Sequence, residues 1–277
     1  MREVEIESGV GVITATIYDS IDPNTVLVIA SATGVKQSFY KKFAEYLSSQ
    51  NVTVITFDYY GIGLSLKGSI KKLTNDAEGW GAEDLESVID YALNNFVGYK
   101  KSLLGHSIGG QLVGLSKSST KMDKIVLVAA QSGYWKLWDG VGRIKLWFNW
   151  HILFPLLTNL FGYLPSKKIS GMENLPKNVA NQWSKWGKNK DYLLSDKSLK
   201  ETFFEKYYSE IAAFSIDDDD FAPRKAVEWM TGRYSNAKTK TRHLIPKDYN
   251  TQKIGHFGVF KERFKDTIWK DLLNEIK

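Results

Sequence analysis

The sequence predicts an α/β fold with a mostly parallel, doubly wound sheet. Apolar, β-branched runs alternate along the chain with amphipathic segments of helical length, which is the order typical of such a sheet. Two of these runs, Val26–Ala30 and Ile125–Ala130, are apolar throughout, as expected for strands covered on both faces. Functional sites on sheets of this kind lie at the carboxyl ends of the strands.

The individual elements follow from these patterns. Strands are predicted at Val12–Tyr18, Thr25–Ser31, Val52–Asp58, Ser102–Gly105, Lys124–Ala130, Ile211–Ile216 and Thr239–Ile245. Helices are predicted at Gln37–Gln50, Ala82–Phe96, Gly109–Lys117, Pro223–Tyr234 and Lys261–Ile276.

Residues 131–207 interrupt this alternation. No strand is predicted there, and the segment holds six of the nine tryptophans: Trp135, Trp138, Trp147, Trp150, Trp183 and Trp186. Because loops at strand ends tolerate insertions, we expect a helical, aromatic-rich lid over one end of the sheet. Residues 1–130 and 208–277 then form the two parts of the core. The alternative is that the segment is an ordinary part of the core that is rich in aromatic residues.

The net charge of +6 is concentrated in this insertion. Between Gly133 and Lys190 the chain has nine Lys or Arg residues and two acidic ones, Asp139 and Glu173, which gives this segment a formal charge of +7. A basic excess confined to one insertion does not indicate a nucleic-acid-binding surface, and the chain has no nucleic-acid-binding motif. We therefore expect no nucleic-acid partner.

Composition also bears on localisation and cofactors. The absence of cysteine excludes disulfides and thiolate metal sites. The N-terminus is charged where a signal peptide has its apolar region, and the longest apolar stretch, Ile144–Leu164, is interrupted by polar residues. We therefore expect a cytoplasmic protein without a transmembrane helix. No dinucleotide fingerprint, Walker A loop or His-rich metal spacing is present, so we expect neither a cofactor nor a metal.

A Gly-x-Ser-x-Gly motif, Gly105 to Gly109, lies between a predicted strand and a predicted helix. In a nucleophile elbow the serine occupies a sharp strand-to-helix turn, and the glycines allow the close approach of neighbouring backbones. The following helix N-terminus directs partial positive charge at the site. Ser107 is therefore the candidate nucleophile, and the alternative is a turn with no chemical role.

A serine hydroxyl needs a base to accept its proton. Of the four histidines, His106 lies inside the elbow and is expected to point away from the serine. His151 belongs to the aromatic insertion and His243 to the last predicted strand, so both are expected to be structural. His256 follows that strand in a glycine-rich turn, and we predict that it is the base.

The acid is expected after the predicted strand at Ile211–Ile216, where the chain has four consecutive aspartates, Asp217 to Asp220. Neighbouring carboxylates repel one another, so most of the four should be solvated while one orients the imidazole. The alternative is a cation site, but ligands from adjacent residues rarely converge on one ion.

Several motifs in order resemble those of the α/β-hydrolase superfamily. They are Asp58 to Ser65, which resembles the family's Asp-x-x-Gly-x-Gly-x-Ser, the Gly105 to Gly109 elbow, an aspartate four residues before Pro223, and a histidine after a glycine. The similarity extends from Val26 to Lys277 and is greatest to a bacterial branch of predicted hydrolases near the serine aminopeptidase and monoglyceride lipase-like group. It implies an α/β-hydrolase fold with a lid after strand 6, and it favours Asp219 as the triad acid, with Asp218 as the second candidate.

The first loop departs from the family pattern. Where the family usually has His-Gly, this chain has Ser31-Ala32-Thr33-Gly34. Matching by position assigns the oxyanion hole to the backbone N–H groups of Thr33 and Ile108, a role that needs only an amide. The hydroxyl of Thr33 or Ser31 either adds a further donor or caps the following helix.

These residues together predict a serine hydrolase that cleaves a carboxylic ester of a small, apolar acyl substrate. Thioesterases, peptidases and acyltransferases use the same triad, and a non-catalytic binding protein of the same fold is a further alternative. Trp147, Trp150 and the neighbouring lysines also suggest a weak contact between the lid and a membrane surface. The sequence makes no prediction of oligomeric state.

Overall fold

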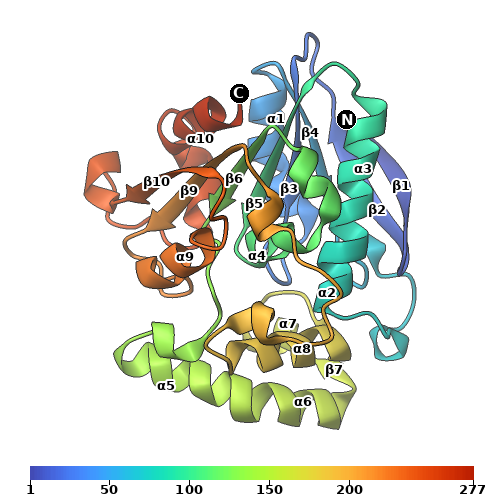
Figure 1. Cartoon of the computed structure of the whole chain (residues 1–277), viewed down its shortest axis with the longest axis vertical. Helices are drawn as coiled ribbons and strands as arrows, with labels where there is room; N and C mark the ends of the chain where they lie inside the picture. Colours follow the sequence, from blue (N-terminus) through green and yellow to red (C-terminus); the bar gives the residue numbers. More distant parts are fainter.

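One eight-stranded sheet forms the centre of the computed structural model, which describes residues 1–277 (Figure 1). Its strand order is β1-β2-β4-β3-β5-β6-β9-β10. The strands are β1 (Arg2–Ser8), β2 (Gly11–Tyr18), β3 (Thr25–Ala30), β4 (Val52–Phe57), β5 (Lys100–His106), β6 (Lys124–Val128), β9 (Glu210–Ile216) and β10 (Lys238–Leu244). Only the β1–β2 and β2–β4 pairs are antiparallel, so the mostly parallel sheet predicted from the sequence is confirmed.

Helices cover both faces of the sheet because both faces of its central strands are apolar. Every residue of β3 and β4 is buried. Val26 and Val28 pack in a core of 39 buried residues that includes the apolar side of α3 (Glu86–Asn95). Leu27 and Ile29, which point to the other face, pack in a core of 28 buried residues with α1 (Lys41–Ser48) and α10 (Ile268–Ile276).

Strand β1 and two helix ends differ from the sequence prediction. β1 was missed because its residues are mostly charged: it is an edge strand in which Glu3, Glu5 and Glu7 alternate with Val4 and Ile6. The predicted helix at 261–276 becomes α-helical only at Ile268, since its first part forms short 3₁₀ turns. Helix α4 (Ile108–Leu112) likewise ends early and continues as a 3₁₀ turn.

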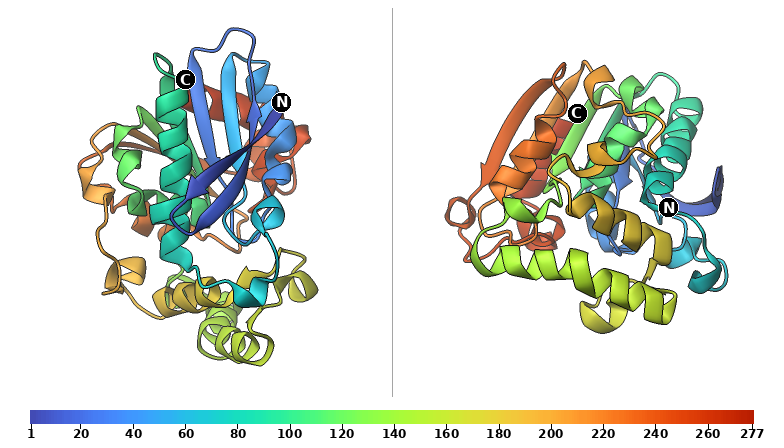
Figure 2. Two further views of the ribbon diagram at one scale, coloured as in Figure 1. Left: turned by 90° about the vertical axis from the view of Figure 1, so that its right-hand side faces the viewer. Right: turned by 60° about the horizontal axis from the view of Figure 1, so that its bottom comes forward.

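The chain between β6 and β9 lies across the carboxyl ends of the parallel strands (Figures 1 and 2). It contains α5 (Gly140–Phe148), the π-turn η8 (Asn149–Leu153), α6 (Phe154–Phe161), α7 (Ser166–Ile169) and α8 (Lys177–Gly187). It also contains a two-residue strand pair, β7 (Tyr163–Leu164) and β8 (Leu175–Pro176), which the sequence did not predict. We refer to residues 131–207 as the helical insertion. No helix of the protein has both the length and the apolar character that crossing a bilayer requires.

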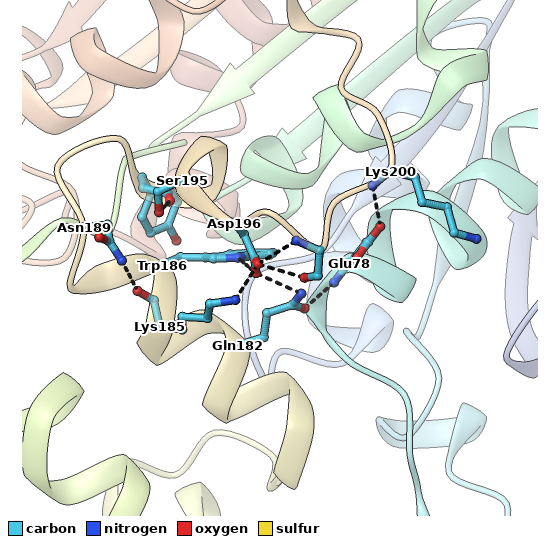
Figure 3. Close-up of polar contacts among 10 residues, drawn as sticks. Glu78, Gln182, Lys185, Trp186, Asn189, Ser195, Asp196 and Lys200 are labelled. Carbon is cyan, nitrogen blue, oxygen red and sulfur yellow. Dashed lines mark hydrogen bonds and ion pairs between the residues drawn. The ribbon is translucent and has the colours of Figure 1, made fainter.

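A buried carboxylate binds the end of the helical insertion to α8, which in turn contacts the core (Figure 3). The Asp196 carboxylate accepts hydrogen bonds from Lys185 Nζ at 2.5 Å, Trp186 Nε1 at 2.8 Å and Gln182 Nε2 at 3.3 Å. Burial alone would raise the pKa of Asp196, but the donors around it hold that pKa below its ordinary value. The Oε1 atom of Gln182 in turn accepts the backbone N–H of Glu78, in α2 (Ala77–Gly79) of the core, at 2.8 Å.

Asp84 joins the edge hairpin to the loop after β4. Its carboxyl group accepts hydrogen bonds from Ser8 Oγ at 2.6 Å and from the backbone N–H of Tyr60 at 2.8 Å. The side chain is completely buried, and this burial raises the pKa of Asp84 to about 7.

The raised pKa of Asp84 predicts a pH-dependent stability. The folded protein binds this proton more tightly than the unfolded chain, in which an aspartate titrates near pH 4. The contribution of Asp84 to stability is therefore fully present below about pH 4 and is lost as the pH rises through about 7. The wild type should therefore lose up to about 4 kcal/mol of unfolding free energy between pH 4 and pH 8 through this group. Asp84→Asn has no carboxyl group to titrate, so we expect the variant not to show this loss.

Urea unfolding at a series of pH values measures this difference. Asp22→Asn, at an exposed turn position, is the matched control and should follow the wild-type profile. Parallel profiles for wild type and Asp84→Asn would contradict the prediction.

Candidate active site

Ser107 occupies a strained turn between β5 and α4. Its backbone has φ 55° and ψ −121°, a conformation that residues other than glycine rarely adopt. The turn is held in place because the Ser107 N–H donates to the Val128 carbonyl at 2.9 Å and the Ser107 carbonyl accepts from the Gly110 N–H at 3.0 Å. The serine lines the cavity described below.

The two motif glycines are required by contacts between backbones. A Cβ atom at Gly105 would lie 2.4 Å from Gly110 Cα, and one at Gly109 would lie 2.2 Å from the Ala30 carbonyl oxygen. These distances are far below van der Waals contact, and the obstructing atoms belong to the main chain, so they cannot move aside as a flexible side chain could. The Gly-x-Ser-x-Gly pattern therefore reflects the close packing of α4 against β3 and β5.

His256 and Asp219 form a buried hydrogen-bonded pair. His256 Nδ1 and Asp219 Oδ2 are 2.7 Å apart, and both side chains are almost completely excluded from solvent. The other carboxylate oxygen, Asp219 Oδ1, accepts the backbone N–H groups of Phe221 at 2.8 Å and Ala222 at 3.1 Å. These two bonds fix the carboxylate in the turn that follows β9.

Asp217 and Asp218 have partners other than His256, and Asp220 is exposed. Asp218 accepts the backbone N–H groups of Ile254 and Gly255, each at 3.0 Å, and so holds the loop that carries His256. Asp217 lies beside His243, with a distance of 3.3 Å between Oδ1 and Nε2. The carboxylates diverge, and no group of three or more His, Cys, Asp or Glu side chains is arranged to hold a metal ion.

His106 is buried beneath the site, in contact with the His256 ring at a centroid distance of 4.9 Å. Its Nε2 lies 3.1 Å from the His256 carbonyl oxygen and its Nδ1 lies 2.8 Å from Tyr40 Oη. Burial and the nearby His256 ring hold the pKa of His106 well below its ordinary value, so the ring is neutral. A carbonyl only accepts, so Nε2 carries the proton and Nδ1 accepts the Tyr40 hydroxyl. Tyr40 Oη in turn accepts the Ala32 N–H at 3.0 Å.

Two backbone amides near the elbow have no partner, one in the loop after β3 and one at the start of α4. The backbone N–H groups of Thr33 and Ile108 have no acceptor within the chain, the latter because it is the first residue of α4. The Thr33 hydroxyl is buried and also has no partner, whereas Ser31 Oγ donates to the Phe57 carbonyl at 3.3 Å. Neither hydroxyl caps the following 3₁₀ turn, whose N-cap is Lys36, so the capping alternative was wrong.

The Asp58 to Ser65 motif is hydrogen-bonded to the segment that follows this loop. The Asp58 carboxylate accepts the backbone N–H groups of Gln37 at 2.7 Å and Leu64 at 2.9 Å. A Cβ atom at Gly63, where φ is +48°, would lie 2.3 Å from the Asp58 carboxylate. The motif therefore ties the segment after Gly34 to the end of β4, and its residues do not line the cavity.

A cavity of about 220 Å³ lies between the core and the helical insertion. Ser107, His256 and Thr33 line its core side, and thirteen of its 23 lining residues are hydrophobic. The insertion contributes mainly large apolar side chains: Trp138, Leu146, Trp150, Leu153, Phe154, Leu164, Ile169, Met172, Leu175 and Trp183.

A chain of buried polar side chains that the sequence analysis missed links the insertion to the elbow helix. Trp183 Nε1 donates to Tyr192 Oη at 2.8 Å, and the Tyr192 hydroxyl donates to Gln111 Oε1 at 2.6 Å. Gln111 Nε2 donates to Gln131 Oε1 at 3.2 Å, and Gln131 Nε2 donates to the Phe221 carbonyl at 3.1 Å. The one available signal was Gln111 itself, a polar residue on the otherwise apolar helix that follows the nucleophile elbow.

Solved structures with this fold include several hydrolases. A soluble variant of monoglyceride lipase from Saccharomyces cerevisiae, in complex with a substrate analogue, has a TM-score of 0.69 at 13% identity, over 96% of this chain and 91% of that chain. An esterase from Exiguobacterium antarcticum has a TM-score of 0.59 at 13% identity, over 99% and 98%. An α/β serine hydrolase without lid from Xanthomonas campestris has a TM-score of 0.56 at 11% identity, over 99% and 91%. At these identities the likeness shows the fold alone.

No curated protein sequence matches the chain significantly. Residues 21–204, which are more than half of the chain, match the family described as serine aminopeptidase, S33. The nucleophile-elbow geometry and the fold agree with this match. The chain therefore belongs to the serine aminopeptidase family and is an α/β-fold serine hydrolase.

Proposed function

We propose that the protein hydrolyses a carboxylic ester of a small, apolar substrate through an acyl-enzyme on Ser107, with His256 as general base and Asp219 as the acid that orients it. The observation that supports this most directly is the convergence at one cavity. Ser107 and His256 both line it, and His256 is held by Asp219 at 2.7 Å.

The proton positions suit general-base catalysis. With Asp219 Oδ1 already accepting two backbone N–H groups, Oδ2 accepts the proton on His256 Nδ1. His256 Nε2 then carries a free lone pair, which is the acceptor that the Ser107 hydroxyl proton requires. In this arrangement Asp219 stabilises the imidazolium without itself taking a proton.

The proposed reaction has two steps. Ser107 Oγ forms a bond to the carbonyl carbon while His256 takes its proton, and the carbonyl oxygen becomes an oxyanion. His256 then gives this proton to the leaving alcohol as the C–O bond breaks. Water repeats the sequence on the acyl-enzyme and releases the acid and free Ser107. The Thr33 and Ile108 amides, which have no acceptor in the chain, are the proposed oxyanion donors, worth about 3 kcal/mol each in the transition state.

The lining of the cavity favours an ester with an apolar acyl group over the N-terminus of a peptide. A free α-amino group needs a carboxylate partner when it is removed from water. Glu173 is the one acidic residue that lines the cavity, and it already pairs with Lys36 at 3.7 Å and Lys167 at 3.3 Å. The mostly apolar wall would instead bind a hydrocarbon chain.

The first test is loss of the nucleophile and of the base. We expect Ser107→Ala and His256→Ala each to abolish labelling by a fluorophosphonate probe. Each should also lower kcat for p-nitrophenyl esters by at least about 10³-fold, because the members of the proposed triad act together. His243→Ala, which removes a histidine outside the cavity, is the matched control. Full turnover by Ser107→Ala would contradict the proposal.

The second test separates the two aspartates. Asp219→Asn should lower kcat by about 10⁴-fold, since an amide in that position no longer holds the required tautomer of His256. Asp218→Asn should lower kcat by about tenfold or less, because Asp218 touches only backbone N–H groups of the loop. Steady-state kinetics of both variants at pH 7.5 would decide this, and a larger loss in Asp218→Asn would reverse the assignment.

The third test addresses the acyl group. If the cavity binds a hydrocarbon chain, kcat/KM for p-nitrophenyl esters should rise about fourfold for each added methylene until the cavity is full, as burial of about 0.8 kcal/mol per methylene implies. Phe154→Ala, which enlarges the apolar wall, should move the optimum to longer chains, whereas Val97→Ala at an exposed loop should not. A flat profile in both wild type and Phe154→Ala would argue against an acyl-binding cavity.

A further inference from the structure

The outer side of the helical insertion exposes an unusual amount of apolar surface. Eight of the chain's eighteen exposed large hydrophobic residues fall within residues 141–161. Six of them, each between 41% and 70% exposed, follow one another at intervals of three or four residues: Val141, Ile144, Phe148, Ile152, Leu156 and Leu160. We call this set the outer apolar stripe.

The π-turn keeps this stripe on one side of the helix. Helix α5, η8 and α6 form one continuous helical segment, since the residues at both junctions have right-handed helical dihedrals. In an α-helix a spacing of four residues advances the side chains by about 40° beyond a full turn, so a long run at this spacing would wind around the axis. A π-turn has more residues per turn, so a step of four residues across Asn149–Leu153 falls short of a full turn. This shortfall offsets the advance in the α-helical parts, so the six side chains stay on one side.

The opposite side of the same helical segment is already occupied. Leu146, Trp150, Leu153 and Phe154 line the cavity, and Trp150 Nε1 donates to the Gly133 carbonyl at 2.9 Å. The outer apolar stripe therefore lies on the side of the helical segment that does not line the cavity. Figure 1 and the left view of Figure 2 place α5 and α6 along the edge of the molecule that is farthest from the sheet.

The positive charge of the insertion indicates which kind of surface the outer apolar stripe could bind. The segment from Gly133 to Lys190 carries a formal charge of +7, while the whole chain carries +6. Its two acidic residues are already paired, Asp139 with Arg143 and Lys225, and Glu173 with Lys36 and Lys167. Lys145, next to Ile144 in α5, is exposed, and so is Lys136 in the 3₁₀ turn that precedes α5. An apolar helix face flanked by lysine and arginine matches an anionic lipid surface, in which the apolar side chains enter the interface and the cations contact the headgroups.

We propose that the outer apolar stripe docks on an anionic lipid bilayer, with Lys136 and Lys145 against the headgroups. The docked helix then lies between the bilayer and the cavity, so that a hydrophobic substrate dissolved in the lipid is held close to the cavity. This inference stands on the exposed surface and its charge, independently of the hydrolytic function proposed above.

Cosedimentation of the full chain with vesicles tests the proposal. We expect binding to vesicles of phosphatidylcholine with about 30% phosphatidylserine at about 0.1 M salt, and at least about tenfold weaker binding to pure phosphatidylcholine or at about 0.5 M salt. Ile144→Gln/Ile152→Gln/Leu160→Gln should weaken binding at least about tenfold, as should Lys136→Gln/Lys145→Gln.

Three controls keep the result interpretable. Ile21→Gln/Val97→Gln changes two apolar residues outside the insertion that are more exposed than those of the stripe, and it should bind as wild type does. Circular dichroism must report a folded chain for every variant. Hydrolysis of a short, water-soluble ester should be unchanged in the stripe variant, because none of its three positions lines the cavity. An inactive wild type that still binds vesicles would remove the hydrolytic proposal and leave this one intact.

Two results would overturn the docking proposal. One is wild-type protein that does not bind anionic vesicles, or binds them as well after the triple glutamine substitution. The other is a wild-type dimer by sedimentation velocity that the same substitution converts to monomer with no binding to vesicles, since a second copy of the chain would then be what covers the stripe.

Discussion

The contact between α4 and the backbones of β3 and β5 is the constraint on which the site depends. It leaves no room for a Cβ atom at Gly105 or Gly109, and it forces Ser107 into a left-handed conformation at the end of β5. The same contact brings the first amide of α4 next to the loop after β3. One packing arrangement thus positions the Ser107 hydroxyl and the backbone amides of Thr33 and Ile108. The surrounding core holds Ser107 in its strained conformation.

Two neighbouring aspartates after β9 both contribute to the position of His256. Asp218 binds the backbone of the loop that carries the histidine, and Asp219 binds its ring. Consecutive residues can do this because they point in different directions from one tight turn. The carboxylates of Asp217, Asp218 and Asp219 therefore make separate contacts, and of these three only Asp219 bonds the imidazole ring of His256.

Most of the fold could be predicted from the sequence because buried parallel strands are recognisable as continuous apolar runs. Edge strand β1 could not, since its charged residues hide its alternation. Ser107 and His256 are candidates from local motifs, and the structure brings both to one cavity. The family pattern favours Asp219 over Asp218, but the different contacts of these two residues depend on backbone direction, which no local pattern gives. The chain from Trp183 to Gln131 joins residues far apart in sequence, so the polar Gln111 on the apolar elbow helix was its only local signal and did not reveal its partners.

The hydrogen bonds around His106 have a mechanical consequence. They run from the Ala32 amide through Tyr40 and His106 to the His256 carbonyl, and so bridge the two loops on either side of Ser107. The chain begins at a peptide N–H and ends at a peptide oxygen, neither of which exchanges a proton during turnover. It therefore transmits position and not protons: it fixes the loop after β3 relative to the loop that carries His256.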